Sequence, residues 1–594
     1  MPMRATWFGR ESRPLFGWLH SAPSARAGAV LCLPIGDESF PAYRAYGDLA
    51  ERLEAAGVSV VRFDYSGTGN SAAAPAEVVA VEEWLGDVRA AADLLREDGV
   101  DDVTLVGIRS GALLAEHAAT AARASALVLW DPVESGRRWL REVRLLGATG
   151  VSAPREGRGG DADGLEIPGI LLGRRLAEEL SALALGRARV PDGTSVLVLE
   201  RLERPVSAAS RSRLEHLDAT WGRAVDMPRF FDVDTWHPFL SEASIARIEG
   251  WVAERTSRVP GRGPAPGARR GEQSVGGEAR AEVGPGVRER AVRIGPSRMF
   301  GVLTEPSASR GDSGLRVLFV NTGLDRHIGP SRLWVDLARR WAADGSVVLR
   351  VDVSGTGDSP ARPSQRREVT YSAWAVDDVV EAATFLAPED PGSVVLVGTC
   401  SGAYHAIEAG VALRSRAVWA VNPAVPPSTR FPGAPATGSR ADVASTVRRA
   451  TRRANPFFEH LAESRRAVEL AHSLVPGPLW SLLDRLGLYA HAASAFRPLL
   501  DTGASLYVRC GKEESQRFLA YGRSAVRRLE RTGRLTFEVD ELLDHTLLDH
   551  GSQVRVAAAL DSLAQADRTR RTPGSAVAGA LAGSDRGAAG PAGS

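Results

Sequence analysis

The feature that most constrains this 594-residue chain is an internal duplication. Residues 63–71 read FDYSGTGNS and residues 351–359 read VDVSGTGDS, an offset of 288. VGIRSGA (106–112) and VGTCSGA (397–403) follow at an offset of 291, and VLWDPV (128–133) is echoed by VWAVNPA (418–424). A period near 290 is far too long for a solenoid repeat. Each copy must therefore be a complete domain.

Composition indicates where the two copies begin and end. Residues 258–287 are rich in Gly, Pro, Arg and Ser and poor in apolar side chains, and residues 569–594 have the same character. Such segments bury too little apolar surface to offset their ordering entropy. We therefore expect domains at 1–257 and 288–568, a disordered linker at 258–287 and a disordered tail at 569–594.

Short apolar runs alternate with amphipathic helical patterns in both copies. The expected strands are AVLCLP, VSVVRFDY, VTLVG and ALVLWD in the first copy, and LRVLFVN, SVVLRVDV, SVVLVG and AVWAVN in the second. Strands that are apolar throughout are typical of a parallel sheet covered on both faces. The predicted fold class is α/β, twice, each domain a mostly parallel sheet flanked by helices. Residues 135–190 and 425–500 interrupt the two patterns and are expected to form helical lids.

Charge and cysteine content exclude several function classes. The net charge of +1 gives no support for nucleic acid or an anionic membrane as a partner. Three cysteines do not suggest a disulfide framework, and we find no signal peptide and no long apolar run. We expect a cytoplasmic protein with no cofactor, no metal site, and no membrane or nucleic-acid partner.

The second pair of repeats has the form of a nucleophile elbow, in which a strand runs into G-x-Nu-x-G and then a helix. Cys400 holds the nucleophile position in the second copy, within Gly398–Gly402. Arg109 holds it in the first copy, and an arginine cannot attack a carbonyl carbon. Ser110 and Ser401 each come one place late. The sequence therefore predicts covalent chemistry in the second domain and a catalytically degenerate first domain.

These motifs resemble α/β-hydrolases of the serine aminopeptidase-like group, and especially the small bacterial hydrolases associated with exosortase and biosynthetic clusters. The resemblance rests on LPIGDESFPAYRAYGDLAERL, RFDYSGTGNS, VGIRSGA and VLWDPV in the first half. In the second half it rests on NTGLDRHIGPSRLWVDLARR, RVDVSGTGDS, VGTCSGAYHA and DHT (544–546). It implies two tandem α/β-hydrolase domains, the second with Cys in place of the usual Ser.

The remaining catalytic candidates follow from the chain order nucleophile, acid, histidine. LTFEVD (535–540) is expected to be the last strand, and His545 in the loop after it is the candidate base, with His550 as a competitor. The acid should follow SLYVRC (505–510), where we prefer Glu513 and leave Glu514 open. Asp544 is a further alternative. Ser401 and Leu324 are expected to supply the backbone N–H groups of an oxyanion hole.

In the first half, RFFDVD (229–234) is expected to be the last strand, which leaves His237 in the place of a catalytic histidine. Arg109 either binds a carboxylate or phosphate ligand or pairs with Asp131 or Glu38 to hold a degenerate site together. Cys32 and Cys510 are expected to be core residues.

The function that we expect is acyl transfer through an acyl-thioenzyme at Cys400, acting on a small ester or thioester that a carrier protein could present. Hydrolysis and transfer to an acceptor both remain open. Two alternatives also remain: a non-catalytic binding or scaffold protein that kept the fold, and a small-molecule lactone hydrolase.

Overall fold

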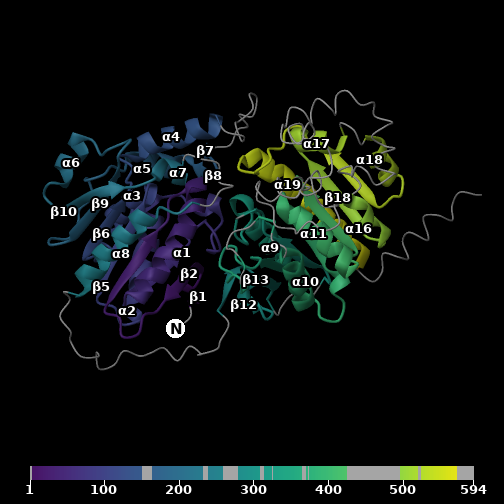
Figure 1. The fold of residues 1–594 in the computed structure, drawn as a ribbon, viewed down its shortest axis with the longest axis horizontal. Coiled ribbons are helices and arrows are strands. Elements are labelled where there is room, and N and C mark those ends of the chain that lie inside the picture. The colour runs from purple at the N-terminus through teal and green to yellow at the C-terminus, as the bar shows by residue number, and fades with distance from the viewer. Residues whose placement is uncertain are drawn as a thin grey trace, which may run out of the picture.

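A computed structural model describes most of the chain (Figure 1). The described residues are 3–149, 164–231, 239–257, 279–307, 313–323, 325–363, 365, 370–371, 374–424, 495–519 and 523–571. In this part of the chain, no helix is both long and apolar enough to span a lipid bilayer.

The first half contains an eight-stranded sheet in the order β1-β2-β4-β3-β5-β6-β9-β10. Its strands are β1 (Arg4–Arg10), β2 (Arg13–His20), β3 (Ala27–Cys32), β4 (Ser59–Phe63), β5 (Asp102–Ile108), β6 (Ala126–Trp130), β9 (Ser195–Arg201) and β10 (Asp218–Ala224). All pairings are parallel from β4 onward, and β2 pairs antiparallel with both β1 and β4. The α-helices are α1 (Ser39–Ala55), α2 (Val81–Glu97), α3 (Ser110–Ala118), α4 (Gly136–Thr149), α5 (Arg174–Ala182), α6 (Ala208–Leu214), α7 (Met227–Phe231) and α8 (Glu242–Ser257).

The second half repeats this plan in a nine-stranded sheet, β11-β12-β13-β15-β14-β16-β17-β18-β19. Its strands are β11 (Arg280–Gly284), β12 (Val287–Ile294), β13 (Met299–Pro306), β14 (Arg316–Val320), β15 (Val347–Val351), β16 (Val395–Thr399), β17 (Ala417–Val421), β18 (Ser505–Cys510) and β19 (Leu535–Val539). The six strands from β15 to β19 are parallel, and β11, β12 and β13 are antiparallel. Its α-helices are α9 (Leu333–Ala343), α10 (Ala375–Leu386), α11 (Ser401–Leu413), α16 (Arg497–Asp501), α17 (Lys512–Leu519), α18 (Arg523–Glu530) and α19 (His550–Arg571).

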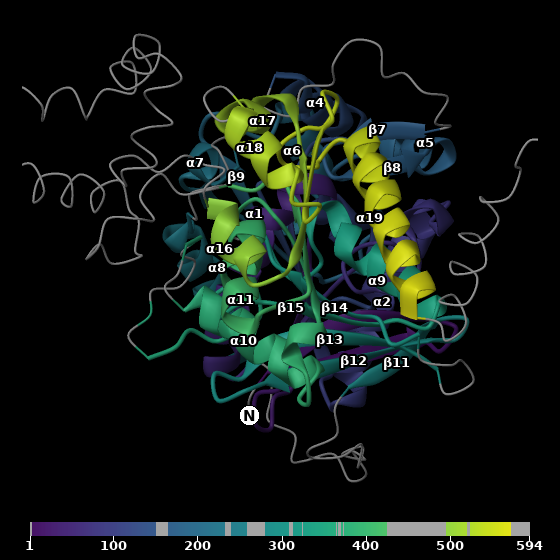
Figure 2. The same cartoon turned by 90° about the vertical axis from the view of Figure 1, so that its right-hand side faces the viewer.

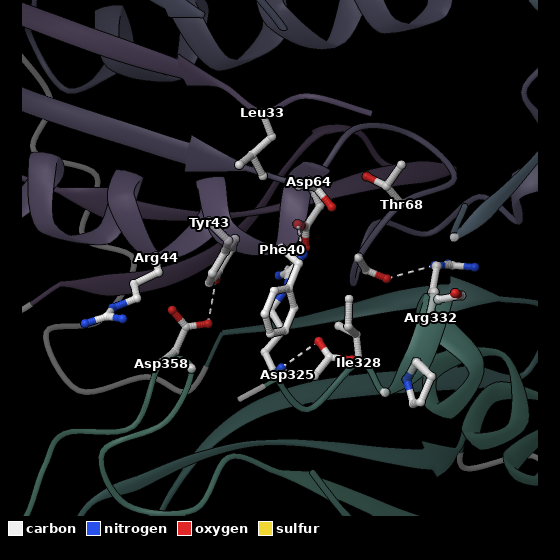
Figure 3. Close-up of a pocket in the computed structure, with 18 of the residues that line it drawn as sticks. Leu33, Phe40, Tyr43, Arg44, Asp64, Thr68, Asp325, Ile328, Arg332 and Asp358 are labelled. Atoms are coloured by element: carbon white, nitrogen blue, oxygen red, sulfur yellow. Dashed lines mark hydrogen bonds and ion pairs between the residues drawn. The ribbon is translucent and has the colours of Figure 1, made fainter. Parts of the chain in front are cut away.

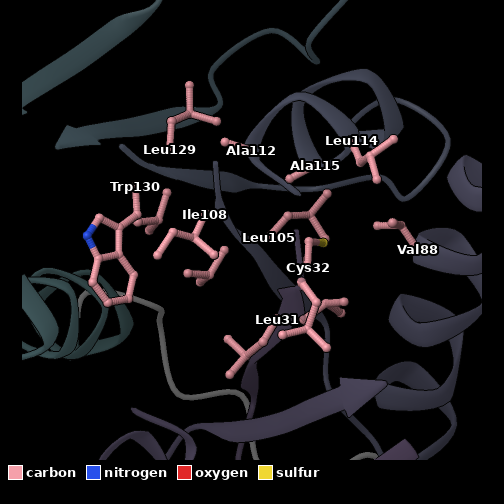
Figure 4. Close-up of a cluster of buried hydrophobic side chains, with 14 of the residues drawn as sticks. Leu31, Cys32, Val88, Leu105, Ile108, Ala112, Leu114, Ala115, Leu129 and Trp130 are labelled. Atoms are coloured by element: carbon pink, nitrogen blue, oxygen red, sulfur yellow. The ribbon is translucent and has the colours of Figure 1, made fainter. Parts of the chain in front are cut away.

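The central strands are buried on both faces, as their uniformly apolar sequences predict. In the first half, Leu31 and Cys32 of β3 pack beside Leu105 of β5, with Val88 of α2 and Ala115 of α3 against them (Figure 4). Each of these side chains has 0 % exposure. The predicted fold class, a mostly parallel α/β fold present twice, is confirmed.

Three expectations about individual segments need correction. RFFDVD does not begin a strand: residues 227–231 form α7, and the last strand among the described residues of the first half is β10, which starts eleven residues earlier than predicted. The predicted linker ends early, because β11 begins at Arg280 and pairs with β12. The first lid segment contains a β-hairpin, β7 (Gly164–Ile167) and β8 (Ile170–Gly173), between α4 and α5. Residues 425–494 of the second lid segment lie outside the described residues.

The two halves contact one another along their SGTG turns and first strands (Figures 1 and 2). Trp18 of β2 meets Phe300 of β13 edge to face, with ring centroids 4.7 Å apart. Arginines of the second half hold the turn of the first: Arg332 donates to the carbonyl oxygens of residues 69, 71 and 73, and Arg339 to those of residues 70, 71 and 72. The SGTG turn of the first half is thus part of the interface between the halves.

Candidate active site

Cys400 occupies a strained turn between β16 and α11. Its backbone has φ 51° and ψ −121°, values that an L-residue adopts only when its surroundings force it. The flanking glycines are required: a Cβ at Gly398 would lie 2.4 Å from the Gly402 backbone, and one at Gly402 would lie 2.5 Å from the Asn321 carbonyl oxygen. The turn places Cys400 at the N-terminus of α11, where the helix dipole favours a thiolate.

His545 and Glu514 complete a chain of polar groups that leads to the cysteine. Nδ1 of His545 donates to Oε1 of Glu514 across 2.9 Å, and the same imidazole hydrogen-bonds the Cys400 sulfur. Burial lowers the pKa of His545, but the hydrogen bonds and charges of Cys400 and Glu514 outweigh burial and raise it to about 10. The arrangement therefore favours a protonated imidazole beside the Cys400 sulfur.

Glu514, and not the preferred Glu513, contacts His545. Both lie in the first turn of α17, but Glu514 is 5 % exposed and faces His545, whereas Glu513 points to solvent. Asp544 is engaged within its own loop, where it accepts hydrogen bonds from Thr546, Leu547 and Asp549. His550 begins α19, and it is His545, not His550, that lines the cavity with Cys400.

Asn422 positions this pair of loops and was missed by sequence reasoning. Its amide nitrogen donates to the carbonyl oxygens of Asp544 and His545, at 2.9 and 3.2 Å, and its Oδ1 accepts the Gly511 N–H at 2.8 Å. One side chain therefore ties the histidine loop to the turn that carries Glu514. The echo of VLWDPV in VWAVNPA marked the position, because Asn422 stands where the first copy has Asp131.

Ser401 points away from the cysteine, as its position one place late predicts. Its Oγ accepts the Gly323 N–H at 2.7 Å and joins the loop after β14 to the start of α11. Leu324, the expected second oxyanion donor, lies outside the described residues, and the oxyanion hole remains a prediction.

The first half has the same elbow backbone as the second, but an arginine stands at the nucleophile position. Arg109 has φ 53° and ψ −123°, nearly the values of Cys400. Its guanidinium lies 2.9 Å from Glu38, 2.9 Å from Glu142 and 3.7 Å from Asp131. Of the two interpretations left open, this geometry supports the structural one: three carboxylates already surround the buried cation. His237 lies outside the described residues.

The other two cysteines are core residues. Cys32 and Cys510 both have 0 % exposure, and burial raises the pKa of the Cys32 thiol to about 12. Neither is placed for thiolate chemistry at neutral pH.

A possible ligand set that the sequence did not suggest lies between the halves. One potential ligand atom from each of His327, Asp352 and Asp358 lies within 4.8 Å of the others. These atoms already have protein partners: Nδ1 of His327 bonds Asp352 at 2.9 Å and its Nε2 bonds Asn70 at 2.9 Å, while Asp358 accepts from Tyr43. The cluster therefore acts as part of the polar interface.

Cys400 and His545 line a cavity of about 630 Å³ whose walls come from both halves (Figure 3). That volume is typical of a small-molecule site. The first half contributes the loop around Ile35 and one side of α1, and the second half contributes the loops around Asp325 and Asp358.

Comparison with known proteins agrees with this architecture. The family model described as serine aminopeptidase, S33, matches residues 41–149, and the model described as alpha/beta hydrolase family matches residues 317–566. No curated protein sequence matches the chain.

Solved structures resemble the chain over less than half its length. A hydrolase from Agrobacterium vitis S4 is 20 % identical, with a TM-score of 0.30 over 43 % of this chain and 98 % of its own. Est1E from Butyrivibrio proteoclasticus, solved with ferulic acid, is 17 % identical, with a TM-score of 0.30 over 42 % of this chain and 98 % of its own. An α/β serine hydrolase without a lid, XC6422 from Xanthomonas campestris, is 14 % identical, with a TM-score of 0.26 over 48 % and 94 %.

Proposed function

Because the chain consists of two α/β-hydrolase domains in tandem, we propose that it is an acyl-transfer enzyme whose nucleophile is Cys400. The observation that carries the proposal is the chain of contacts from the Cys400 sulfur through His545 to Glu514. A nucleophile, a base and a group that orients the base are the parts that covalent acyl transfer needs.

The reaction divides into two halves. The Cys400 thiolate attacks the carbonyl carbon of an ester or thioester, and the tetrahedral intermediate collapses as the bond to the leaving group breaks. Protonated His545 gives its Nε2 proton to the departing oxygen or sulfur. The acyl group is then held as a thioester on Cys400, and His545 is neutral.

Neutral His545 next takes a proton from water, an alcohol, an amine or a thiol, which attacks the acyl carbon. The bond to the Cys400 sulfur breaks, and the thiolate–imidazolium pair is restored. Water gives hydrolysis, and the other acceptors give transfer. Glu514 keeps the imidazole in the tautomer and orientation that both halves require.

Intact-mass analysis after exposure to a panel of activated esters and acyl thioesters tests the proposal. We expect one acyl adduct on the wild type and on Cys32→Ala, which removes a buried thiol of the first-half core, and none on Cys400→Ala. Absence of adduct and turnover across the panel would instead support a binding protein that kept the hydrolase fold.

A further inference from the structure

The cavity beside Cys400 is elongated, and one wall is a single stripe of α1 in the first half. The stripe comprises Ser39, Phe40, Tyr43, Arg44, Gly47, Asp48 and Glu51. These positions follow the i, i+3, i+4, i+7 spacing of one helix face. At 1.5 Å per residue, the stripe runs for about 18 Å. A catalytically degenerate domain thus supplies a long wall to the other domain's cavity.

The N-terminal end of this stripe lies toward the loop of the second half that carries His545. Just before α1, the N–H of Asp37 donates to the carbonyl oxygen of Pro168 in the β7–β8 hairpin. Gly169, which follows Pro168, donates to the carbonyl oxygen of Leu548, three residues after His545. Phe40 is therefore on the side of the loop that carries His545, and Gly47 and Glu51 lie progressively farther from that loop along α1. Figure 3 shows Phe40 and Tyr43 directed from α1 toward Ile328 and Asp358 of the second half.

Gly47 leaves the middle of the cavity open. A Cβ at this position would have only one neighbour within 4 Å, an Arg62 guanidinium nitrogen at 3.8 Å. Glycine inside a helix costs about 1 kcal/mol relative to alanine. Its presence here in a pocket-lining position is consistent with space kept for a ligand.

The arginines in the part of the cavity around Asp358 differ in whether a carboxylate lies within ion-pair distance. Arg62 has Asp358 at 3.4 Å, and Arg326 has Asp64 at 2.6 Å. Arg293 donates to the carbonyl oxygens of Asp358 and Arg298 rather than to a carboxylate. Among the residues that the structure describes, neither Arg293 nor Arg298 forms an ion pair.

Arg293 lines the cavity beside Asp358, which contacts Tyr43. It bonds the backbone of Asp358, whose carboxylate accepts from Tyr43 at 2.6 Å, and it lies over the rings of Trp18 and Phe300. Burial lowers the pKa of Arg293, and the charges of Asp358 and Asp352 only partly offset burial, so an anion placed beside Arg293 would gain from its charge. The second arginine, Arg298, is exposed at the edge of the cavity.

We propose that this cavity binds an extended acyl substrate that lies along α1 of the first half and carries an oxyanion paired with Arg293 and Arg298. The inference rests on the proposed function of Cys400. The oxyanion has two possible sources, a phosphate on the leaving group or a carboxylate at the end of the acyl chain. In either case the degenerate half selects the substrate and the other half reacts with it.

Blocking the cavity at Gly47 tests the path. Gly47→Trp fills the open middle, and Gly86→Trp is the matched control, because Gly86 of α2 is also helical, has open space around it and lies outside the cavity. One series is acetyl and dodecanoyl esters of one leaving group, and the other is acetyl thioesters of ethanethiol and pantetheine. In the series whose long part lies along α1, we expect the long-to-short ratio of kcat/KM to fall at least tenfold in Gly47→Trp only. An unchanged ratio in both series in a folded Gly47→Trp enzyme would overturn the path along α1.

Matched pairs of substrates test the anion. One pair is acetyl-pantetheine and acetyl-4′-phosphopantetheine, and the other is a butyryl and a glutaryl ester. We expect one charged member to be preferred by at least tenfold, and this preference to disappear in Arg298→Gln and Arg293→Gln but not in Arg288→Gln, a residue on β12 outside the cavity. The pair that shows the preference identifies the source of the oxyanion.

The two proposals fail in distinguishable ways. If no substrate acylates Cys400, the proposed function fails. If the neutral substrates acylate Cys400 but neither charged member is preferred, the function stands and the anion site is wrong.

Discussion

Arg326 of the second half donates two hydrogen bonds to the carboxylate of Asp64 in the first half, at 2.6 and 3.2 Å. Asp64 is 2 % exposed and also accepts the N–H of Asn70 within its own SGTG turn. Burial alone would raise the pKa of Asp64, but Arg326 outweighs burial and holds it below its ordinary value. The two halves therefore share a buried ion pair at the turn that the duplication preserved.

Removing one partner should be costly, because it leaves a buried charge uncompensated. We expect Arg326→Ala to lower the free energy of unfolding by roughly 3–5 kcal/mol, measured by urea denaturation. Arg340→Ala breaks a more exposed pair with Asp561 and should cost under about 1 kcal/mol. Equal losses in the two variants would show that the Arg326–Asp64 pair does not hold the halves together.

The acid assignment is tested by two neighbouring glutamates. We expect Glu514→Gln to reduce kcat by about 10²–10⁴, because the imidazole loses the carboxylate that orients it. Glu513→Gln, one residue away and solvent-facing, should leave kcat within twofold. Steady-state kinetics on one activated thioester decides the question, and a reversed order of effects would restore the sequence-based choice of Glu513.

The neighbouring glutamates also show what sequence reasoning lacks. The pattern SLYVRC-GKEES correctly predicted a strand with acidic residues directly after it. Which glutamate turns inward depends on the helical phase of α17, which starts at Lys512 and buries Glu514 and Ser515. A few residues after a strand do not reveal that phase.

Long-range relationships were harder still to predict. The elbow was predictable because its strain demands glycines at fixed spacing, and the structure has them at Gly398 and Gly402. RFFDVD was misread as a strand because its apolar run is too short to distinguish strand from helix. The shared cavity had no local signal at all, since the contact between Tyr43 and Asp358 joins residues 315 positions apart.

The protonation of His545 should be visible in both titration and stability. Its pKa of about 10 in the folded state lies above the ordinary value of 6.5. A raised pKa means that the stabilisation is fully present below about pH 6.5 and is lost as the pH rises through about 10. We expect the imidazole resonance of His545 to titrate near pH 10 by NMR, and at lower pH in Cys400→Ala and Glu514→Gln. Titration near 6.5 in the wild type would contradict the thiolate–imidazolium pair.

Arg109 should matter for stability and not for chemistry. Arg109→Ala leaves Glu38, Asp131 and Glu142 together without their central cation. We expect the free energy of unfolding to fall by roughly 3–5 kcal/mol, while the stoichiometry of acyl labelling at Cys400 stays at one in the folded fraction. Arg89→Ala, which breaks an exposed pair with Asp93, is the control. Full stability in Arg109→Ala would argue that the carboxylates await a ligand rather than hold the elbow.

The β7–β8 hairpin of the first half should position the histidine loop of the second. Oε1 of Glu166 accepts the N–H of His550 at 2.8 Å, at the N-terminus of α19, and Gly169 donates to Leu548 at 3.2 Å. A carboxylate at a helix N-terminus contributes about 0.3–1 kcal/mol, so we expect Glu166→Ala to lower kcat by up to about fivefold with KM unchanged. Amide hydrogen exchange should rise in residues 544–552, and Glu166→Gln, which keeps an acceptor, should recover most of the rate. A loss of thermal stability without a change in kcat or in exchange of this loop would reduce the hairpin to a purely structural contact.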